Sequence, residues 1–314
     1  MRDSFIKGLT TVAKSDPKVM LLTADLGYGV LDDFRKQCPT QFLNVGIAEQ
    51  NMIGIATGLA IDGHVVYTYS IANFSFMRCL EQIRNDAAYH GCNVNVVAIG
   101  GGFSYGALGI SHHATEDLAI MRSIPDVTVL APGDNFEAEA VARATYNTPG
   151  VSYTRLDRVG AGESHNDDNA FTIGKSRVLR PGKDLTLIAT GGIVSEAIKV
   201  ADVLSTKNVS VRVVSLHTIK PIDKPAIIEA ARETGGILTM EEHCVDGGLG
   251  GAVAEILLEA GAPPKFFKRI GLRDGFSSIV GSQQFLRKQY GLDEQTIVNL
   301  ILKRIASKSP LRAA

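Results

Sequence analysis

The stretch GIAEQNMIGIATGLA, residues 46–60, decides how the rest of the sequence is interpreted. It has the composition of a helix that begins at about Ala48 and consists mostly of small and apolar residues. Gly54 and Gly58 lie four residues apart, and a glycine inside a helix costs up to about 1 kcal/mol relative to alanine. We therefore expect another backbone to pack closely against this helix. Glu49, the only charged residue of the stretch, then needs an explanation, because close packing would remove its carboxylate from water.

Two interpretations of Glu49 are open. An acidic residue in the first turn of a helix interacts favourably with the helix dipole, which is worth roughly 0.3–1 kcal/mol at an exposed position. Alternatively, close packing at a domain or subunit interface buries the carboxylate. A buried unpaired charge costs stability, so its presence there would indicate a role in chemistry. Other segments of the sequence are needed to distinguish a carboxylate that only stabilises the helix from one that takes part in chemistry.

The composition is that of a globular protein, with 45% hydrophobic and 21% charged residues. The length of 314 residues is sufficient for two ordinary domains, and the formal net charge of −1 gives no indication of a nucleic-acid or membrane partner. No stretch of about 18 uncharged apolar residues is present to span a bilayer. The cysteines lack metal-ligand spacing and indicate free thiols in the cytoplasm. They are Cys38, Cys79, Cys92 and Cys244.

Short β-branched runs alternate with segments of helical periodicity in the first half of the chain. The expected strands are residues 19–25, 42–46, 65–70, 94–100, 127–132 and 151–156. Helices are expected over residues 74–89 and 134–146. Apolar strands flanked by helices predict an α/β fold with a parallel sheet covered on both faces.

A polar, glycine-bearing stretch over residues 157–184 interrupts this pattern and contains at most one short strand. A second α/β set follows, with strands and helices in turn at residues 185–191, 194–206, 209–216, 223–234 and 236–243. We therefore predict two α/β domains, each with its own core and a mostly parallel sheet covered by helices. The predicted boundaries are a first domain at 1–160, a linker at 161–184 and a second domain at 185–314.

The segment VGIAEQNMIGIATGLA (45–60) resembles the thiamine-diphosphate-binding helix of the transketolase family, which includes 1-deoxyxylulose-5-phosphate synthase. The resemblance implies a pyrimidine-binding domain followed by a transketolase C-terminal domain. It also implies that Glu49 hydrogen-bonds N1′ of the cofactor's aminopyrimidine. A carboxyl group that shares a proton with N1′ stabilises the imino tautomer, whose 4′-nitrogen then removes the weakly acidic thiazolium proton.

Two further segments resemble the parts of the family that surround the cofactor. TADLG (23–27) places Asp25 in a loop near the cofactor, although the residue alone would read as a turn cap after a strand. YSIANFSFMRCLEQIRND (69–86) resembles the segment whose aromatic rings pack on the pyrimidine. Its candidates are Phe74, the best match, and Phe76 and Tyr69; taken alone, the phenylalanines are equally explained as core residues.

The substrate contacts implied by the resemblance are a histidine and an arginine. GISHHATEDLAIMRSIPDVTVLAPGD (109–134) places His112 on the catalytic histidine that contacts the substrate, and SYTRLDR (152–158) places Arg155 on the arginine that holds a sugar phosphate. Without the resemblance, the adjacent histidines suggest metal, but no Glu or Cys at ligand spacing completes such a site. Arg155 is otherwise an ion-pair residue, although ligand contacts in α/β sheets do lie at strand ends.

Full-length transketolases also carry a diphosphate-binding domain with a Gly-Asp-Gly … Asn motif, which this sequence lacks. The resemblance therefore implies the C-terminal subunit of a split transketolase. An N-terminal partner subunit would supply the ligands of the Mg²⁺ or Ca²⁺ ion that bridges the diphosphate, so no metal ligand is expected in this chain. The expected assembly is a heterotetramer in which the glycine-bearing helix packs across a subunit interface.

The implied reaction is transfer of a two-carbon ketol unit from a ketose, expected to be phosphorylated, to an aldose. The alternatives are a 1-deoxyxylulose-5-phosphate-synthase-like or 2-oxo-acid-dehydrogenase β-type subunit, and a non-catalytic transketolase-like chain. One departure concerns the substrate: Gly100–Gly102 stand where transketolases carry an Asp that reads a donor hydroxyl. Either the ketose is unusual, or Ser104 or Tyr105 reads that hydroxyl.

Overall fold

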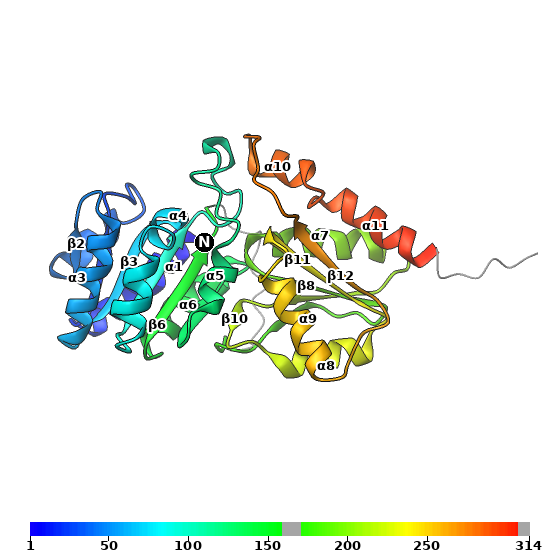
Figure 1. Ribbon diagram of the computed structural model, residues 1–314, viewed down its shortest axis with the longest axis horizontal. Coiled ribbons are helices and arrows are strands. Elements are labelled where there is room, and N and C mark those ends of the chain that lie inside the picture. The colour runs from blue at the N-terminus through cyan, green and yellow to red at the C-terminus, as the bar shows by residue number, and fades with distance from the viewer. Residues whose placement is uncertain (159–170, 307–314) are drawn as a thin grey trace, which may run out of the picture.

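The computed structural model describes residues 1–158 and 171–306, so residues 161–170 of the expected linker lie outside this part. Two α/β units lie side by side, each with a sheet between helices (Figure 1). The predicted fold class is confirmed.

The first unit contains a seven-stranded sheet in the order β10-β5-β6-β4-β3-β1-β2. All neighbouring strands are parallel except β10, which is antiparallel to β5. The strands are β1 (Val19–Thr23), β2 (Phe42–Asn44), β3 (Val65–Ile71), β4 (Val94–Ile99), β5 (Val127–Leu130), β6 (Val151–Leu156) and β10 (Thr218–Lys220). The first six match the predicted runs: β1, β3, β4, β5 and β6 are largely buried on both faces of the sheet, whereas the edge strand β2 is half-buried to exposed.

Helices cover both faces of this sheet. One face packs on α1 (Arg2–Ser15), α2 (Asp32–Gln37) and α6 (Asn135–Tyr146). The other packs on α3 (Glu49–Ile61), a π-helix (Gln82–Ala88) and α5 (Asp117–Ser123). The single helix predicted over residues 74–89 is interrupted: a short α4 (Ala72–Ser75) precedes a turn and the π-helix. The interruption directs Phe76 into the core and leaves Arg78 exposed.

The second unit contains a five-stranded sheet in the order β12-β11-β8-β9-β7, parallel except for β7. Its strands are β7 (Arg177–Arg180), β8 (Leu185–Ala189), β9 (Val211–Ser215), β11 (Ile237–Cys244) and β12 (Phe267–Leu272). Its helices are α7 (Val194–Ser205), α8 (Lys224–Glu233), α9 (Leu249–Glu259), α10 (Gln283–Gln289) and α11 (Glu294–Ala306). Strand β7 lies within the segment expected as a linker, yet it is an edge strand of this sheet.

The two units share part of one hydrophobic core, whereas the sequence predicted a separate core for each. Val129 of the first sheet lies in the same buried cluster as Leu216 and Ile219, which flank and form β10, and as Leu249 of α9. Strand β10 joins the first sheet although it follows β9 in the chain. The second unit is therefore fixed against the first by a strand and by shared apolar packing.

The parallel strands of the first sheet end at one edge, at the top of the view in Figure 1. There, α4 follows β3, and the loop after β4 projects beside α10. The two segments touch, since Gly281 N donates to Gly106 O at 3.2 Å. This edge is where parallel α/β sheets place ligand contacts.

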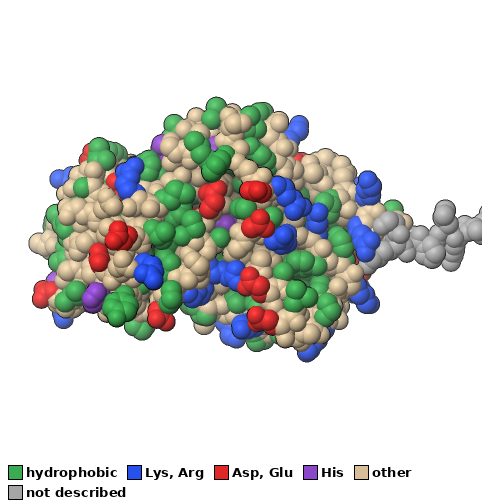
Figure 2. Space-filling view, in the orientation of Figure 1, with side chains coloured by type: hydrophobic (Ala, Val, Ile, Leu, Met, Phe, Trp, Pro, Cys, Tyr) green, Lys and Arg blue, Asp and Glu red, His purple; other side chains and the backbone are tan. Residues whose placement is uncertain are grey.

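Charges of both signs are interspersed over both units on the face shown in Figure 2, in keeping with the near-neutral formal charge. Within residues 1–158 and 171–306, no helix is long and apolar enough to cross a membrane.

Candidate functional site

Glu49 is the first residue of α3 and has only 3% of its surface exposed. Arg78 Nη1 donates to its Oε2 at 2.8 Å, and the side chain of Arg78 is itself 47% exposed. The carboxylate is therefore buried but paired, with a cation that itself reaches solvent. Glu49 does lie in the first turn of the helix, as the dipole interpretation expects, but it is buried and not exposed.

Asn44, at the end of β2, connects the turn before Glu49 to the loop of Asp25. Its Oδ1 accepts from the backbone N–H groups of Asp25 and Gly46, both at 3.0 Å, and its Nδ2 donates to Asp25 Oδ1 at 3.1 Å. Tyr28 also donates to Asp25 Oδ1, at 2.9 Å. The hydrogen bonds from Asn44 and Tyr28 hold the pKa of Asp25 below its ordinary value. Sequence reasoning missed Asn44, although a polar residue at the end of an apolar strand was a usable signal.

A row of side chains extends from Arg78 along this edge. The Arg78 guanidinium lies over the Phe74 ring, 4.6 Å from its centroid. The Phe74 ring meets His112 edge-on at 5.2 Å, and His112 meets Tyr105 at 6.0 Å. Arg158 lies over the Tyr105 ring at 5.5 Å. An acid, an exposed cation, an aromatic ring, a histidine, a second aromatic ring and a second exposed cation thus follow one another across the carboxyl edge of the sheet.

Phe76 and Tyr69 do not belong to this row. They are 0% and 1% exposed, and Phe76 packs edge-on against Tyr153 at 6.2 Å within the core. Neither ring has surface to offer a cofactor, so we no longer assign them to its site. Their positions within an aromatic-rich segment did not reveal which rings face inward, because the interrupted helix breaks the expected periodicity. Phe74 is the half-buried ring of the three.

His112 and His113 face opposite ways. His112 is half-buried, and its Nδ1 lies 2.9 Å from Ser111 Oγ. Burial, and then the neighbouring His113, lower the pKa of His112, which favours the neutral imidazole near pH 7. His113 is 1% exposed, and its Nε2 lies 3.1 Å from Gly106 O. In the described part of the chain, no three His, Cys, Asp or Glu side chains are grouped to hold a metal ion.

Arg155 occupies a different environment from the one predicted for a phosphate ligand. It is 3% exposed; Nη1 donates to Asp117 Oδ1 at 3.1 Å, and Nη2 donates to Glu242 O at 2.8 Å. The Glu242 carboxylate in turn accepts from Arg287 Nε of α10. Arg155 therefore belongs to a buried ion-pair network between the two units, and the structure does not support its assignment to the sugar phosphate.

Close packing of three neighbouring side chains accounts for the glycines at 100–102. A Cβ on Gly101 would lie 1.9 Å from Arg155 Nε, and one on Gly102 would lie 2.5 Å from Glu242 Oε1. A Cβ on Gly100 would lie 2.2 Å from the Tyr105 ring. The space that a side chain would need is already filled, so the glycines are explained by packing.

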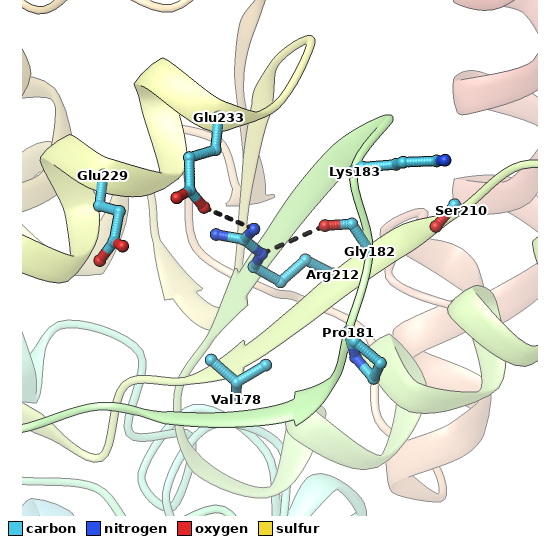
Figure 3. A pocket seen from close by; sticks show the side chains of 8 residues that line it. All are labelled: Val178, Pro181, Gly182, Lys183, Ser210, Arg212, Glu229 and Glu233. Atoms are coloured by element: carbon cyan, nitrogen blue, oxygen red, sulfur yellow. Dashed lines mark hydrogen bonds and ion pairs between the residues drawn. The ribbon is translucent and has the colours of Figure 1, made fainter.

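A separate cavity of about 590 Å³ lies in the second unit (Figure 3). Its walls are Val178, Pro181, Gly182, Lys183, Ser210, Arg212, Glu229 and Glu233. Arg212 is already engaged: it donates to Glu233 at 2.7 Å and to Gly182 O at 3.3 Å. The cavity lies by residues that precede β8 and β9, at the amino ends of those strands, and it contains none of the predicted site residues.

Comparison with known families identifies the domain pair. Residues 1–160 match the family model described as transketolase, pyrimidine binding domain. Residues 174–297 match the one described as transketolase, C-terminal domain. The chain belongs to the transketolase family, and it has the domain content of the C-terminal subunit of a split transketolase. The membership predicted from the sequence is confirmed.

Similar proteins include subunits of split enzymes. The chain is 37% identical to a subunit of the apulose-4-phosphate transketolase of Phocaeicola vulgatus, over 96% of each chain. It is 36% identical to a 6-deoxy-6-sulfo-D-fructose transketolase subunit of Clostridium sp., over 95% of this chain and 92% of that one. A solved structure titled "Split gene transketolase, inactive beta4 tetramer" is 36% identical, covers 96% of each chain and has a TM-score of 0.86.

Proposed function

We propose that this chain is one subunit of a thiamine-diphosphate-dependent split transketolase, which transfers a two-carbon ketol unit from a phosphorylated ketose to an aldose. The observation that carries the proposal is the buried carboxylate of Glu49 in one row with Phe74 and His112. The family implies dependence on thiamine diphosphate. When bound, that cofactor supplies the nucleophilic carbon that attacks the ketose carbonyl.

The residues of this chain fit the pyrimidine half of the cofactor. Glu49 is a buried carboxylate whose partner Arg78 reaches solvent, suited to hold a proton at N1′, and Phe74 offers a half-buried ring for stacking. Asp25 lies in the adjoining loop, joined through Asn44 to the turn that precedes Glu49. His112, neutral near pH 7, is suited to move a proton at a donor hydroxyl.

The diphosphate half is proposed to lie on the partner subunit, together with its Mg²⁺ or Ca²⁺ ion. The described residues offer no group of metal ligands. Large apolar side chains are exposed near the site, as expected of a subunit interface: Ile47 is 79% exposed, Met77 49% and Ile110 50%. A heterotetramer with an N-terminal subunit would cover this surface, whereas the relative solved as a tetramer of β chains is titled inactive.

The anionic end of the substrate is assigned to Arg158 in place of Arg155. Arg158 is exposed, lies over Tyr105 and follows the end of β6. The related subunits are named for apulose 4-phosphate and for a sulfonated fructose, so each named sugar carries an anionic group. A guanidinium is well suited to either group.

Two further assignments are part of the proposal. We take residues 1–160 as the pyrimidine-binding domain and place the start of the C-terminal domain before β7 rather than at residue 185. We place the protein in the cytoplasm, since all four cysteines are free thiols.

The test of the proposal is reconstitution with the N-terminal subunit, thiamine diphosphate, Mg²⁺ and a panel of ketoses and aldoses. We expect ketol transfer, and we expect the isolated chain to bind thiamine diphosphate weakly in calorimetry. Consumption of pyruvate with release of carbon dioxide would instead favour the 1-deoxyxylulose-5-phosphate-synthase-like or dehydrogenase alternative. Activity with none of the substrates would favour the non-catalytic one.

Glu49→Gln separates the catalytic interpretation from a structural one. We expect an intact fold and a fall in turnover of several orders of magnitude, because the amide cannot share the N1′ proton as the acid does. Deuterium exchange at the thiazolium C2 in the reconstituted complex is the direct measurement. Exchange at the wild-type rate would remove Glu49 from the chemistry.

A further inference from the structure

One buried amide holds the turn that carries His112. Asn73 lies in α4 and is 8% exposed. Its Nδ2 donates to the backbone carbonyls of Ile110, Ser111 and His113, at 3.3, 3.2 and 3.0 Å. These three acceptors bracket His112 on both sides in the sequence.

The orientation of the Asn73 amide follows from chemistry. Backbone carbonyls only accept hydrogen bonds, so the NH₂ group of the amide has to face them. Two N–H bonds are shared among three acceptors, which ties three peptide groups of one turn to a single side chain. The backbone of the turn adds bonds from the N–H groups of His112 and His113 to Gly109 O, at 2.9 and 3.1 Å, which set its local shape. The amide is what ties that shape to α4.

The His112 ring itself has few restraints. Its Nδ1 contacts the neighbouring Ser111 Oγ, and its ring packs edge-on against Phe74, the residue that follows Asn73. Asn73 and Phe74 therefore act together from one short helix: the amide fixes the peptide groups on either side of His112, and the phenyl ring meets the imidazole.

We propose that Asn73 is a positioning residue for His112, holding the 109–113 turn so that the imidazole stays in the row between Phe74 and Tyr105. The chemical role of His112 rests on the proposed function, whereas the hold of Asn73 on the turn does not. Asn73 is not a catalytic residue, because it reaches the reaction only through the histidine.

The chain offers a matched control in Asn95 of β4. Asn95 is 1% exposed, its Nδ2 donates to Asn93 Oδ1 at 3.3 Å, and its Oδ1 accepts from Ser152 at 2.5 Å. It is likewise a buried amide that is hydrogen-bonded through its side chain, but its partners are side chains and it lies near the start of its strand rather than at the carboxyl edge. Loss of either amide is expected to cost stability, but only the loss of Asn73 should change the surroundings of His112.

The first measurement is the titration of His112 in the full isolated chain, by NMR of protein labelled with ¹³C in its histidine rings. His112→Asn assigns the resonance. In Asn73→Ala the released turn lets water reach the imidazole, so its pKa should move up toward the ordinary value, while Asn95→Ala should leave it unchanged. If Asn73→Ala does not fold, Asn73→Ser retains one donor and should give a smaller shift in the same direction. An unchanged His112 titration in a folded Asn73 variant would overturn the proposal.

The second measurement is a double-mutant cycle on ketol transfer in the reconstituted complex. A displacement of His112 by about 1 Å is expected to lower kcat by roughly 10- to 100-fold in Asn73→Ala. In the His112→Asn background, Asn73→Ala should have almost no further effect, since the group that it positions is gone. Equal losses in both backgrounds would assign Asn73 a purely structural role. Full activity of His112→Asn would instead refute the catalytic role of the histidine, and the NMR titration would still decide the role of Asn73.

Discussion

Replacing the exposed glycines of α3 by alanine should have opposite effects on two quantities. It should raise the stability of the free chain and lower its affinity for the partner subunit. Gly54 lies inside the helix, and no heavy atom lies within 4 Å of a Cβ built on it. The same holds for Gly58 in the last turn. Both positions are exposed, so no backbone within the described chain packs on them and the close contact expected from the sequence is left for another chain to make.

Gly54→Ala should therefore stabilise the isolated chain. Replacing an exposed glycine inside a helix by alanine gains about 0.8–1 kcal/mol, and nothing in the structure opposes the added methyl group. Gly58→Ala should gain less, because it lies in the last turn, so the double variant should gain about 1–2 kcal/mol. Urea unfolding of the dilute chain, followed by circular dichroism, measures this gain.

The same substitutions should weaken assembly with the N-terminal subunit. If a partner backbone packs on this face, each added methyl group overfills the contact at a cost of about 1–3 kcal/mol, which corresponds to roughly 5- to 150-fold in affinity. Gly251→Ala in α9 is the control, since its Cβ would meet atoms no closer than 3.9 Å within the chain. A destabilised free chain would show that the α3 face is already packed, and unchanged affinity for the partner would show that it is not an interface.

Three further outcomes are expected. Gly101→Ala should destabilise the free chain by about 1–3 kcal/mol in urea unfolding, because its Cβ would lie 1.9 Å from Arg155 Nε; unchanged stability would contradict the packing explanation. Arg158→Ala should raise KM for phosphorylated ketoses but not for unphosphorylated ones. Arg155→Ala should chiefly lower stability, by about 3–5 kcal/mol, because Asp117 keeps its hydrogen bond from Tyr153 but loses its buried cationic partner; the opposite pattern would restore Arg155 as the phosphate ligand. Burial, and then Arg177, lower the pKa of His217 to about 3. Below pH 6.5, His217 is therefore protonated in the unfolded chain but stays neutral in the folded one. Each pH unit down to about 4 should then remove about 1.4 kcal/mol of stability from the wild type relative to His217→Gln. Parallel pH profiles of stability for the two proteins would contradict this.

The fold was predictable from the sequence where burial alone determines it. The apolar runs that form β1, β3, β4, β5 and β6 are strands largely buried on both faces of a parallel sheet, and their near-continuous apolar character is visible in the sequence. Strand β10 has only three residues and joins the first sheet from beyond β9, a pairing set by tertiary contacts such as Ile219 in the shared core. No local pattern encodes that pairing.

The site was predictable only where a segment resembles a known one at a strand end. Arg155 shows the difficulty, because its position near the end of β6 suggested a ligand contact, while its partners Asp117 and Glu242 lie 38 and 87 residues away in the sequence. Conversely, Asn44, Asn73 and Arg78 carry no motif of their own. They form the hydrogen bonds and stacking that hold Asp25, His112 and Glu49, and such supporting residues become visible only when the loops are brought together.

The burial of Glu49 favours the functional interpretation over the helix-dipole one on energetic grounds. Interaction with the helix dipole is worth at most about 1 kcal/mol at the surface, whereas removing a carboxylate from water costs several kcal/mol unless it is paired. With 3% of its surface exposed, Glu49 is too deeply buried for the dipole to be a sufficient reason to keep it. Its partner Arg78 is half exposed and stacks on Phe74 instead of being enclosed with the acid. An ion pair with a half-exposed arginine contributes little to stability. If the cofactor's aminopyrimidine is to take the place of the Arg78 guanidinium beside Glu49, as we propose, then Arg78 has to be able to move away toward solvent, and its exposure allows this.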